Sequence, residues 1–196
     1  SSECFEHRDC KMDFDLSEEQ RLLKDSVDGL LADSYDFEQR KKYAAEKDGW
    51  SRQVWGKLAE QGLLGLPFSE NDGGFGAGAV ETAIVMESLG RSLVLEPYLT
   101  TVVIGGGFLR HGASAEQKAA HIPSIIDGSN TLAFAQLEKN SRYDLADVST
   151  TAKKKGDGWV IRGEKFVVLH GDSASTLVVT ARTSGGQRDR DGIGVF

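Results

Sequence analysis

Apolar residues in the first part of the chain recur at helical spacing and predict a succession of helices. Leu23, Val27, Leu30 and Leu31 fall on one side of the first helix. Before them, residues 17–20 (Ser-Glu-Glu-Gln) form a capping box, in which a serine hydroxyl and a glutamine side chain each satisfy an unpaired main-chain amide. Similar patterns predict further helices over residues 51–61, 77–89, 98–111 and 114–126, the last beginning at a second capping box.

After Gly128 the pattern changes to short apolar runs separated by turn residues, which predicts strands. These runs cover residues 131–137, 148–153, 159–161, 165–169, 176–181 and 193–196. Gly156-Asp157-Gly158 lies between two of them and predicts a hairpin turn. Helices followed by strands indicate an α+β fold, because a nucleotide-binding sheet would alternate strands with helices.

Composition excludes several classes of protein. The chain has 196 residues, of which 39% are hydrophobic and 27% charged, as in an ordinary globular protein. Its net charge of −7 argues against nucleic acid as a partner, which would require a basic face. No apolar run reaches the ~18 residues of a membrane span, so we expect no membrane partner.

The N-terminus has a character of its own. Met12 opens a segment that looks like a natural start, so we expect residues 1–12 to be a leader or an upstream remnant. Cys4 and Cys10 lie within it, and their spacing does not match a C-x2-C metal motif. No cysteine follows them, so no disulfide framework is expected and a cytoplasmic location fits.

Individual motifs assign no reaction to the chain. The glycine-rich segment 73–78 follows a predicted helix, whereas a dinucleotide fingerprint follows a strand, so we interpret it as a connector. The four histidines, His7, His111, His121 and His170, lack metal-ligand spacing, so no metal site is expected. Lys153–Lys155 fits an exposed hairpin end, with a contact to a ligand phosphate as the alternative.

Six segments nevertheless carry a combined pattern in their order and spacing. They are residues 16–20, 55–66, 72–76, 86–92, 111–118 and 156–165. Together they resemble the N-terminal and middle domains of the acyl-CoA dehydrogenases, and the resemblance covers residues 12–196. Within this family the chain is most similar to the small subunits of pimeloyl-CoA dehydrogenases, which implies an acyl group that carries a second carboxylate.

The resemblance implies a flavin enzyme that oxidises an acyl-CoA to its 2,3-enoyl form. In the family a carboxylate base removes the α-proton while hydride passes from the β-carbon to flavin N5. We expect an N-terminal all-α domain over residues 13–128 and a truncated, antiparallel β-barrel-like middle domain over residues 129–196. The C-terminal helical domain, which usually carries the base, is expected to be absent, so no catalytic residue is assigned and the chain alone should be inactive.

The resemblance also implies where ligands bind. The expected FAD-binding residues are Phe134, Gln136, Leu137, Val167, Val168 and Leu169. Arg142 and Tyr143 are expected near the acyl-CoA substrate, and the acyl chain near residues 98–103. Arg142 pairs with a second substrate carboxylate in one interpretation, although a surface role is favoured.

Three of these segments depart from the family pattern. Leu137-Glu138-Lys139 stands where the family has Thr-Glu-Pro. Residues 142–144 (Arg-Tyr-Asp) stand where the family has Gly-Ser-Asp. Residues 167–169 (Val-Val-Leu) stand where the family has Trp-Ile-Thr. Family hydroxyls that contact the flavin and the substrate are thereby lost, at a cost of ~1–3 kcal/mol for each unsatisfied buried group.

Three hypotheses remain open at this point. The chain is a flavoenzyme subunit with an unusual pocket, or a flavin-poor, non-catalytic partner subunit of a hetero-oligomeric acyl-CoA dehydrogenase. As its partners we expect an acyl-CoA and, in a homo- or hetero-oligomer, a paralogous subunit. Outside the family, it is a helical interaction domain fused to a β-domain.

Overall fold

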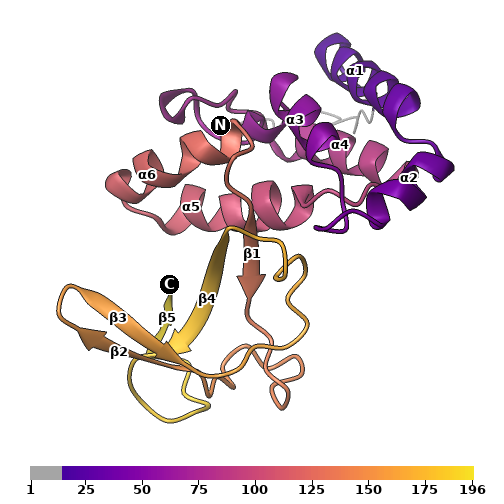
Figure 1. Ribbon diagram of the computed structural model, residues 1–196. Coiled ribbons are helices and arrows are strands. Elements are labelled where there is room, and N and C mark those ends of the chain that lie inside the picture. The colour runs from indigo at the N-terminus through magenta and orange to yellow at the C-terminus, as the bar shows by residue number, and fades with distance from the viewer. Residues whose placement is uncertain (1–14) are drawn as a thin grey trace, which may run out of the picture.

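A computed structural model describes residues 15–196 of the chain. The expected leader over residues 1–12, with Cys4, His7 and Cys10, lies outside the described residues. Figure 1 shows the helices gathered on one side of the molecule and the strands on the other, with α5 and α6 nearest to the sheet. No helix among residues 15–196 is both long and apolar enough to cross a membrane.

The predicted helices are present, and one helix was missed. The helices are α1 (Glu18–Ser34), α2 (Phe37–Ala44), α3 (Arg52–Glu60), α4 (Ala79–Arg91), α5 (Gly106–Gly112) and α6 (Ala115–Ile126). Both capping boxes form: Gln20 N donates to Ser17 Oγ at 3.2 Å, and Gln117 N donates to Ser114 Oγ at 3.3 Å. Helix α2 has no buried residue, so no apolar face marked it in the sequence.

The single helix expected over residues 98–111 is divided into two parts. Its first part, η3 (Leu99–Gly105), is a π-helix, and α5 continues from it. A Cβ atom at Gly105 would lie 2.7 Å from Cβ of Leu132, so glycine is needed where the helix meets the first strand. This close approach helps to bring the helical part and the sheet together.

The glycine-rich segment is a connector, as interpreted. It runs from a short 3₁₀ turn, η2 (Glu70–Asp72), to the start of α4 and has no strand before it. A Cβ atom at Gly74 would lie 2.3 Å from the carbonyl oxygen of Phe68, so only glycine fits there. The segment therefore turns tightly against its own chain, and its glycines have a structural explanation.

The sheet is mixed, which corrects the expected antiparallel barrel. Its strands are β1 (Leu132–Ala135), β2 (Thr151–Lys155), β3 (Gly158–Arg162), β4 (Thr176–Arg182) and β5 (Ile193–Val195). The order is β1-β4-β2-β3, with β5 also paired to β4, and the described strands do not close into a barrel. Strands β1 and β4 pair in parallel, because the long excursion between them returns the chain to the same end of the sheet.

Residues 165–169 are a loop, although their apolar pattern predicted a strand. Val167 and His170 have φ angles of 50° and 55°, in the left-handed region that β-branched and bulky residues rarely adopt. Lys165, which precedes them, is anchored by tertiary hydrogen bonds to Gln136 and Thr180. Tertiary contacts therefore override the local β-propensity of this run.

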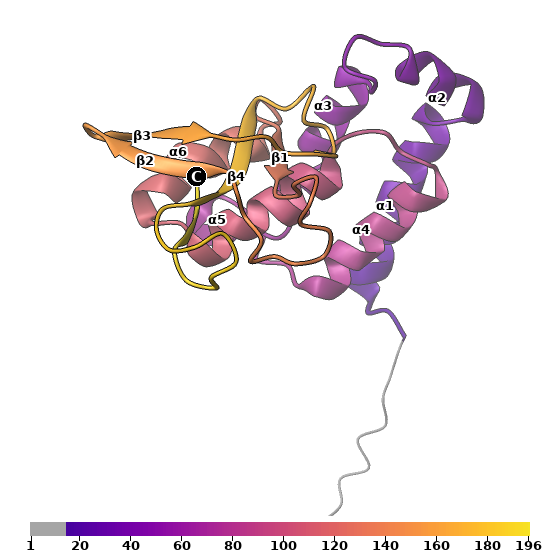
Figure 2. The same cartoon turned by 90° about the horizontal axis from the view of Figure 1, so that it is seen from below.

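Figure 2 shows α5 and α6 on one side of the sheet, and three kinds of contact join the helices to the sheet. Thr101 Oγ1 accepts from Leu132 N at 3.0 Å, which ties η3 to β1. Trp50 Nε1 donates to Ser173 Oγ at 3.1 Å, from the start of α3 to the loop before β4. Phe68, Ile122, Ile125 and Leu132 form a small buried cluster between the two parts. The helical and sheet parts thus share one continuous interface.

Candidate functional site

The structure brings two of the segments expected at the cofactor together on one exposed surface. Phe166 N donates to Leu137 O at 2.7 Å, which places residues 166–169 beside Leu137. We call Leu137, Phe166, Val167 and Leu169 the apolar strip. Their exposed fractions are 40%, 55%, 62% and 57%. The strip therefore exposes apolar side chains and offers no side-chain hydrogen-bonding group.

The other expected cofactor residues lie around this strip in different roles. The Phe134 ring lies 4.6 Å from the Phe108 ring of α5, so Phe134 packs against the helices. The main-chain carbonyl of Gln136 accepts from Lys165 Nζ at 3.1 Å. A Cβ atom at Gly171 would lie 2.8 Å from Cγ1 of Val168, so Val168 packs against its own turn.

The residues expected near the substrate occupy an exposed turn after the strip. Tyr143 is 98% exposed, and Arg142 has a φ angle of 47°. Ser141 fixes the start of this turn by accepting from Glu138 N and donating to Glu138 O. Along η3, Leu99 is 40% exposed, whereas Thr100, Thr101 and Val102 are buried in the helical part.

A buried ion pair lies next to the strip, and no pattern in the sequence predicted it. Lys165 Nζ and Glu138 Oε1 are 2.8 Å apart, and both side chains are more than nine-tenths buried. Burial raises the pKa of Glu138, but hydrogen bonds from Lys165, Ser149 and Thr150 outweigh it and lower the pKa to about 2. The carboxylate therefore stays charged at neutral pH.

Arg182, at the end of β4, is another buried charge of the sheet part. Its guanidinium donates to main-chain carbonyls rather than to a carboxylate. The accepting residues are Ala146, Val148, Ser184, Gln187, Asp189 and Asp191. Arg182 thereby holds the loop between β4 and β5 against the segment that leads into β2.

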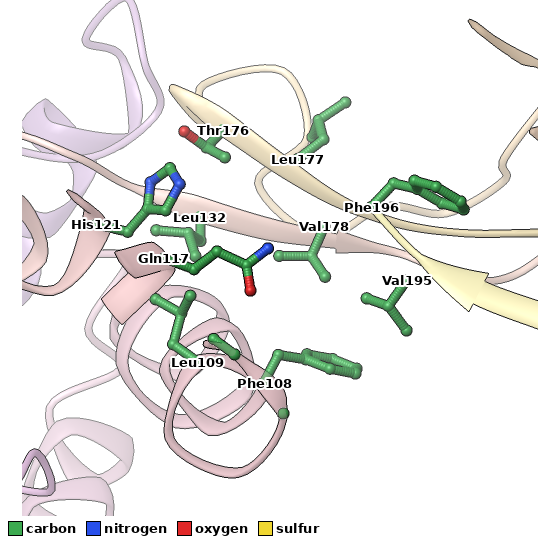
Figure 3. Close-up of a pocket in the computed structure, with 12 residues that line it drawn as sticks. Phe108, Leu109, Gln117, His121, Leu132, Thr176, Leu177, Val178, Val195 and Phe196 are labelled. Carbon is green, nitrogen blue, oxygen red and sulfur yellow. The ribbon is translucent and has the colours of Figure 1, made fainter. Parts of the chain in front are cut away.

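A cavity lies elsewhere, between α5, α6 and strands β1, β4 and β5 (Figure 3). It has a volume of about 430 Å³, and its apolar wall includes Phe108, Leu109, Leu132, Val178, Val195 and Phe196. Gln117, His121 and Thr176 add polar groups to this wall. The sequence contained no signal for the cavity, because its wall comes from separate segments that only the fold brings together. None of the apolar strip lines it.

No metal centre is evident in the part of the chain that the structure describes. Over residues 15–196, no three His, Cys, Asp or Glu side chains gather closely enough to hold a metal ion. His170 lies next to the strip, where burial lowers its pKa and the negative charge of Asp172 partly opposes that change.

Comparison with known proteins matches both parts of the chain. The family model "Acyl-CoA dehydrogenase, N-terminal domain" matches residues 17–129, and "Acyl-CoA dehydrogenase, middle domain" matches residues 133–196. The probable acyl-CoA dehydrogenase YngJ of Bacillus subtilis is 28% identical, over 92% of this chain and 47% of that protein. FadE12 of Mycobacterium tuberculosis is 31% identical, over 85% of this chain and 43% of that protein.

A solved structure shows the same arrangement. The ChsE4-ChsE5 complex of Mycobacterium tuberculosis matches with a TM-score of 0.80 and 27% identity, over 94% of this chain and 48% of that one. The chain thus spans about half the length of the relatives it matches. A particular closeness to pimeloyl-CoA dehydrogenases is not among these findings. Two family models cover the helical part and the sheet part in succession, and the chain belongs to the acyl-CoA dehydrogenase family.

Proposed function

We propose that this chain is one component of a flavin-dependent acyl-CoA dehydrogenase and supports a paralogous chain that carries the flavin. The observation behind this proposal is the chemistry of the apolar strip. Leu137, Val167 and Leu169 stand where the family has Thr, Trp and Thr, and they expose only carbon. The flavin ring has a polar edge, and each buried polar group left without a partner costs ~1–3 kcal/mol. The side chains present do not fit that ring.

Assembly with an unlike chain supports this proposal from another direction. The ChsE4-ChsE5 structure is a complex of two named chains, and its fold matches most of this chain. In such an assembly, one chain can lack groups that the other supplies. The stoichiometry of the proposed assembly is open to direct measurement, by the mass of the co-purified complex.

The proposed substrate is an acyl-CoA, and the finer proposal is an acyl group that ends in a second carboxylate, as in pimeloyl-CoA. Arg142 would pair with that carboxylate, since a guanidinium binds carboxylates through two parallel hydrogen bonds. Arg142 and Tyr143 are both exposed on the same turn, so both are accessible to a ligand. The acyl chain of the substrate would pass near Leu99, the exposed residue of η3.

The test is the flavin content of the complete gene product that contains this chain. Purified alone, it should hold FAD substoichiometrically; co-expressed with a paralogous acyl-CoA dehydrogenase chain, it should co-purify in a yellow complex. The triple variant Leu137→Thr, Val167→Trp, Leu169→Thr should bind added FAD at least about tenfold more tightly, because ring contacts are restored.

A matched control is the double variant Leu145→Thr, Leu177→Thr, which adds hydroxyls at exposed apolar positions away from the strip. It should leave FAD affinity unchanged. Stoichiometric, tightly held FAD in the unmodified protein would refute the supporting role and favour a self-sufficient flavoenzyme.

A further inference from the structure

The ion pair behind the apolar strip uses all of its hydrogen-bonding capacity. Lys165 Nζ donates to Glu138 Oε1 at 2.8 Å, to Gln136 O at 3.1 Å and to Thr180 Oγ1 at 3.1 Å. An ammonium group has three protons, so none is left over. Lys165 thus connects the segment after β1, through Gln136 and Glu138, to Thr180 of β4.

Both carboxylate oxygens of Glu138 also accept hydrogen bonds. Its Oε1 also accepts from Thr150 N at 3.0 Å, and its Oε2 accepts from Ser149 N at 2.8 Å and from the Ser149 hydroxyl. The carboxylate therefore joins the segment after β1 to the segment before β2. A buried pair with complete hydrogen bonding has a single preferred geometry, because any displacement breaks several bonds together.

The two charged residues are the chain neighbours of the strip. Leu137 precedes Glu138, Phe166 follows Lys165, and Phe166 N donates to Leu137 O at 2.7 Å. Any movement of the ion pair would therefore be transmitted directly to both segments of the strip. No other ion pair among residues 15–196 has both side chains buried to this extent.

The backbone of the strip is held in an unfavourable conformation. Val167 has a φ angle of 50°, although a β-branched residue is disfavoured in the left-handed region. On the far side of the loop, Gly171 N donates to Val168 O at 3.0 Å and Ala174 N donates to His170 O at 2.9 Å. Such a conformation persists only where the surroundings hold it from both ends.

We propose that Glu138 and Lys165 are positioning residues, whose ion pair holds Leu137 and Phe166–Leu169 in the shape that this chain presents to its shared active centre. That the strip faces such a centre rests on the proposed function, whereas the control of its shape does not. Replacing a buried ion pair by apolar groups often preserves stability. The specific effect of this pair is therefore the geometry of the strip.

The first test is amide hydrogen exchange in the complete gene product. Lys165→Met should speed exchange at the amides of Phe166 and Gly171 at least tenfold, whereas the amide of Trp55, in α3, should not change. Lys154→Met, an exposed lysine on β2, is the matched control and should change none of them.

A second variant separates positioning from general stabilisation. Glu138→Leu combined with Lys165→Met removes both charges and leaves no unpaired buried ion. Thermal stability should stay close to that of the unmodified protein, while exchange at Phe166 and Gly171 stays at least tenfold faster. If the amides of Phe166 and Gly171 exchange as slowly as in the unmodified protein, the proposal is overturned. It is also overturned if exchange at Trp55 is accelerated as much as at those two amides. If these variants fail to fold, hydrogen exchange at the same amides is measured in Glu138→Gln, which keeps the shape of the side chain.

A kinetic test applies to the assembled complex. The charge-free double variant should lower kcat about tenfold or more, because small displacements of groups around reacting atoms have large effects, and should leave KM for acyl-CoA unchanged. If the complete gene product holds its own flavin, the proposed supporting role fails while the exchange result stands. If exchange is unaltered while flavin content follows the proposed function, only the positioning role fails.

Discussion

The helical part and the sheet part differ in where they place their large apolar side chains. Trp55, Leu58 and Val102 are almost completely buried in one cluster of the helical part. Few apolar residues of the sheet part are buried, and most of those are alanines, together with Leu132 and Val148, while many of its large apolar residues remain exposed. Those exposed residues are Leu137, Tyr143, Leu145, Trp159, Ile161, Phe166, Val167, Leu169, Leu177 and Val195. Apolar burial therefore stabilises the helical part far more than the sheet part.

The sheet part relies instead on buried polar groups. Arg182 donates to several main-chain carbonyls, and Lys165 pairs with Glu138 behind the strip. Such contacts specify geometry well but add little net stability, because the charges must first be desolvated. The helical part is therefore held mainly by its own apolar core, whereas the sheet part depends on a few directional bonds and on the junction with the helices.

One substitution made in both parts should give the largest contrast. Leu58→Ala, in the helical core, should reduce the free energy of unfolding by about 3 kcal/mol, because it leaves a cavity among packed side chains. Leu169→Ala, on the exposed strip, should change it by less than about 0.5 kcal/mol. Urea unfolding followed by tryptophan fluorescence measures both. Equal losses for the two variants would show that the strip is covered in the isolated protein.

The helical part and the sheet part each contain a buried glutamate, and the pKa values of these two residues are shifted in opposite directions. Burial raises the pKa of Glu96 in the helical part, and hydrogen bonds from Tyr35 and Ser51 only partly oppose it. Its Oε2 atom has no hydrogen-bond partner among the described residues. Glu138 in the sheet part has a pKa of about 2, below its ordinary value of 4.5, because its carboxylate is paired.

The same change, Glu→Gln, should therefore have opposite consequences for pH dependence. The contribution of Glu138 is present above pH 4.5 and is lost as pH falls toward 2, so Glu138→Gln should cost about 2 kcal/mol at neutral pH and less in acid. The contribution of Glu96 is present at low pH and is lost as pH rises through its folded-state pKa. Glu96→Gln should then be neutral or stabilising at pH 7.

Thermal unfolding across this pH range measures both variants. On acidification, the difference in stability between each variant and the unmodified protein should shrink. For Glu138→Gln it shrinks from a loss of stability, and for Glu96→Gln from no change or a gain. A parallel pH profile for the two variants would contradict the assignment of one carboxylate as paired and the other as merely buried.

The smallest predicted effect concerns the junction between the two parts. Ser173→Ala removes the acceptor of Trp50 Nε1 and should cost about 1 kcal/mol. Ser184→Ala, an exposed serine of the sheet part, is the matched control and should have no measurable effect. A blue or red shift of the tryptophan emission in Ser173→Ala alone would report the lost contact. Identical stability for both variants would mean that this bond does not couple the two parts.

Much of the candidate site could be named from the sequence, but its arrangement could not. Leu137 and Val167–Leu169 were identified through the resemblance, and the structure brings these segments side by side. The ion pair between Glu138 and Lys165 was missed, because residues so far apart in sequence give no local signal of contact. The cavity beside α5 and α6 was missed for the same reason, since strands from both ends of the sheet part contribute to its wall.

Features that depend on neighbours along the chain follow from the amino-acid sequence alone. The capping boxes at Ser17 and Ser114 begin their helices where they were expected, and the turn at Gly156 joins β2 to β3. The parallel pairing of β1 with β4 and the loop at Val167 depend instead on contacts between distant segments. The physical reason is the range of the interactions: caps and turns form within a few residues, whereas the anchoring of Lys165 by Glu138 and Thr180 exists only after distant segments have met.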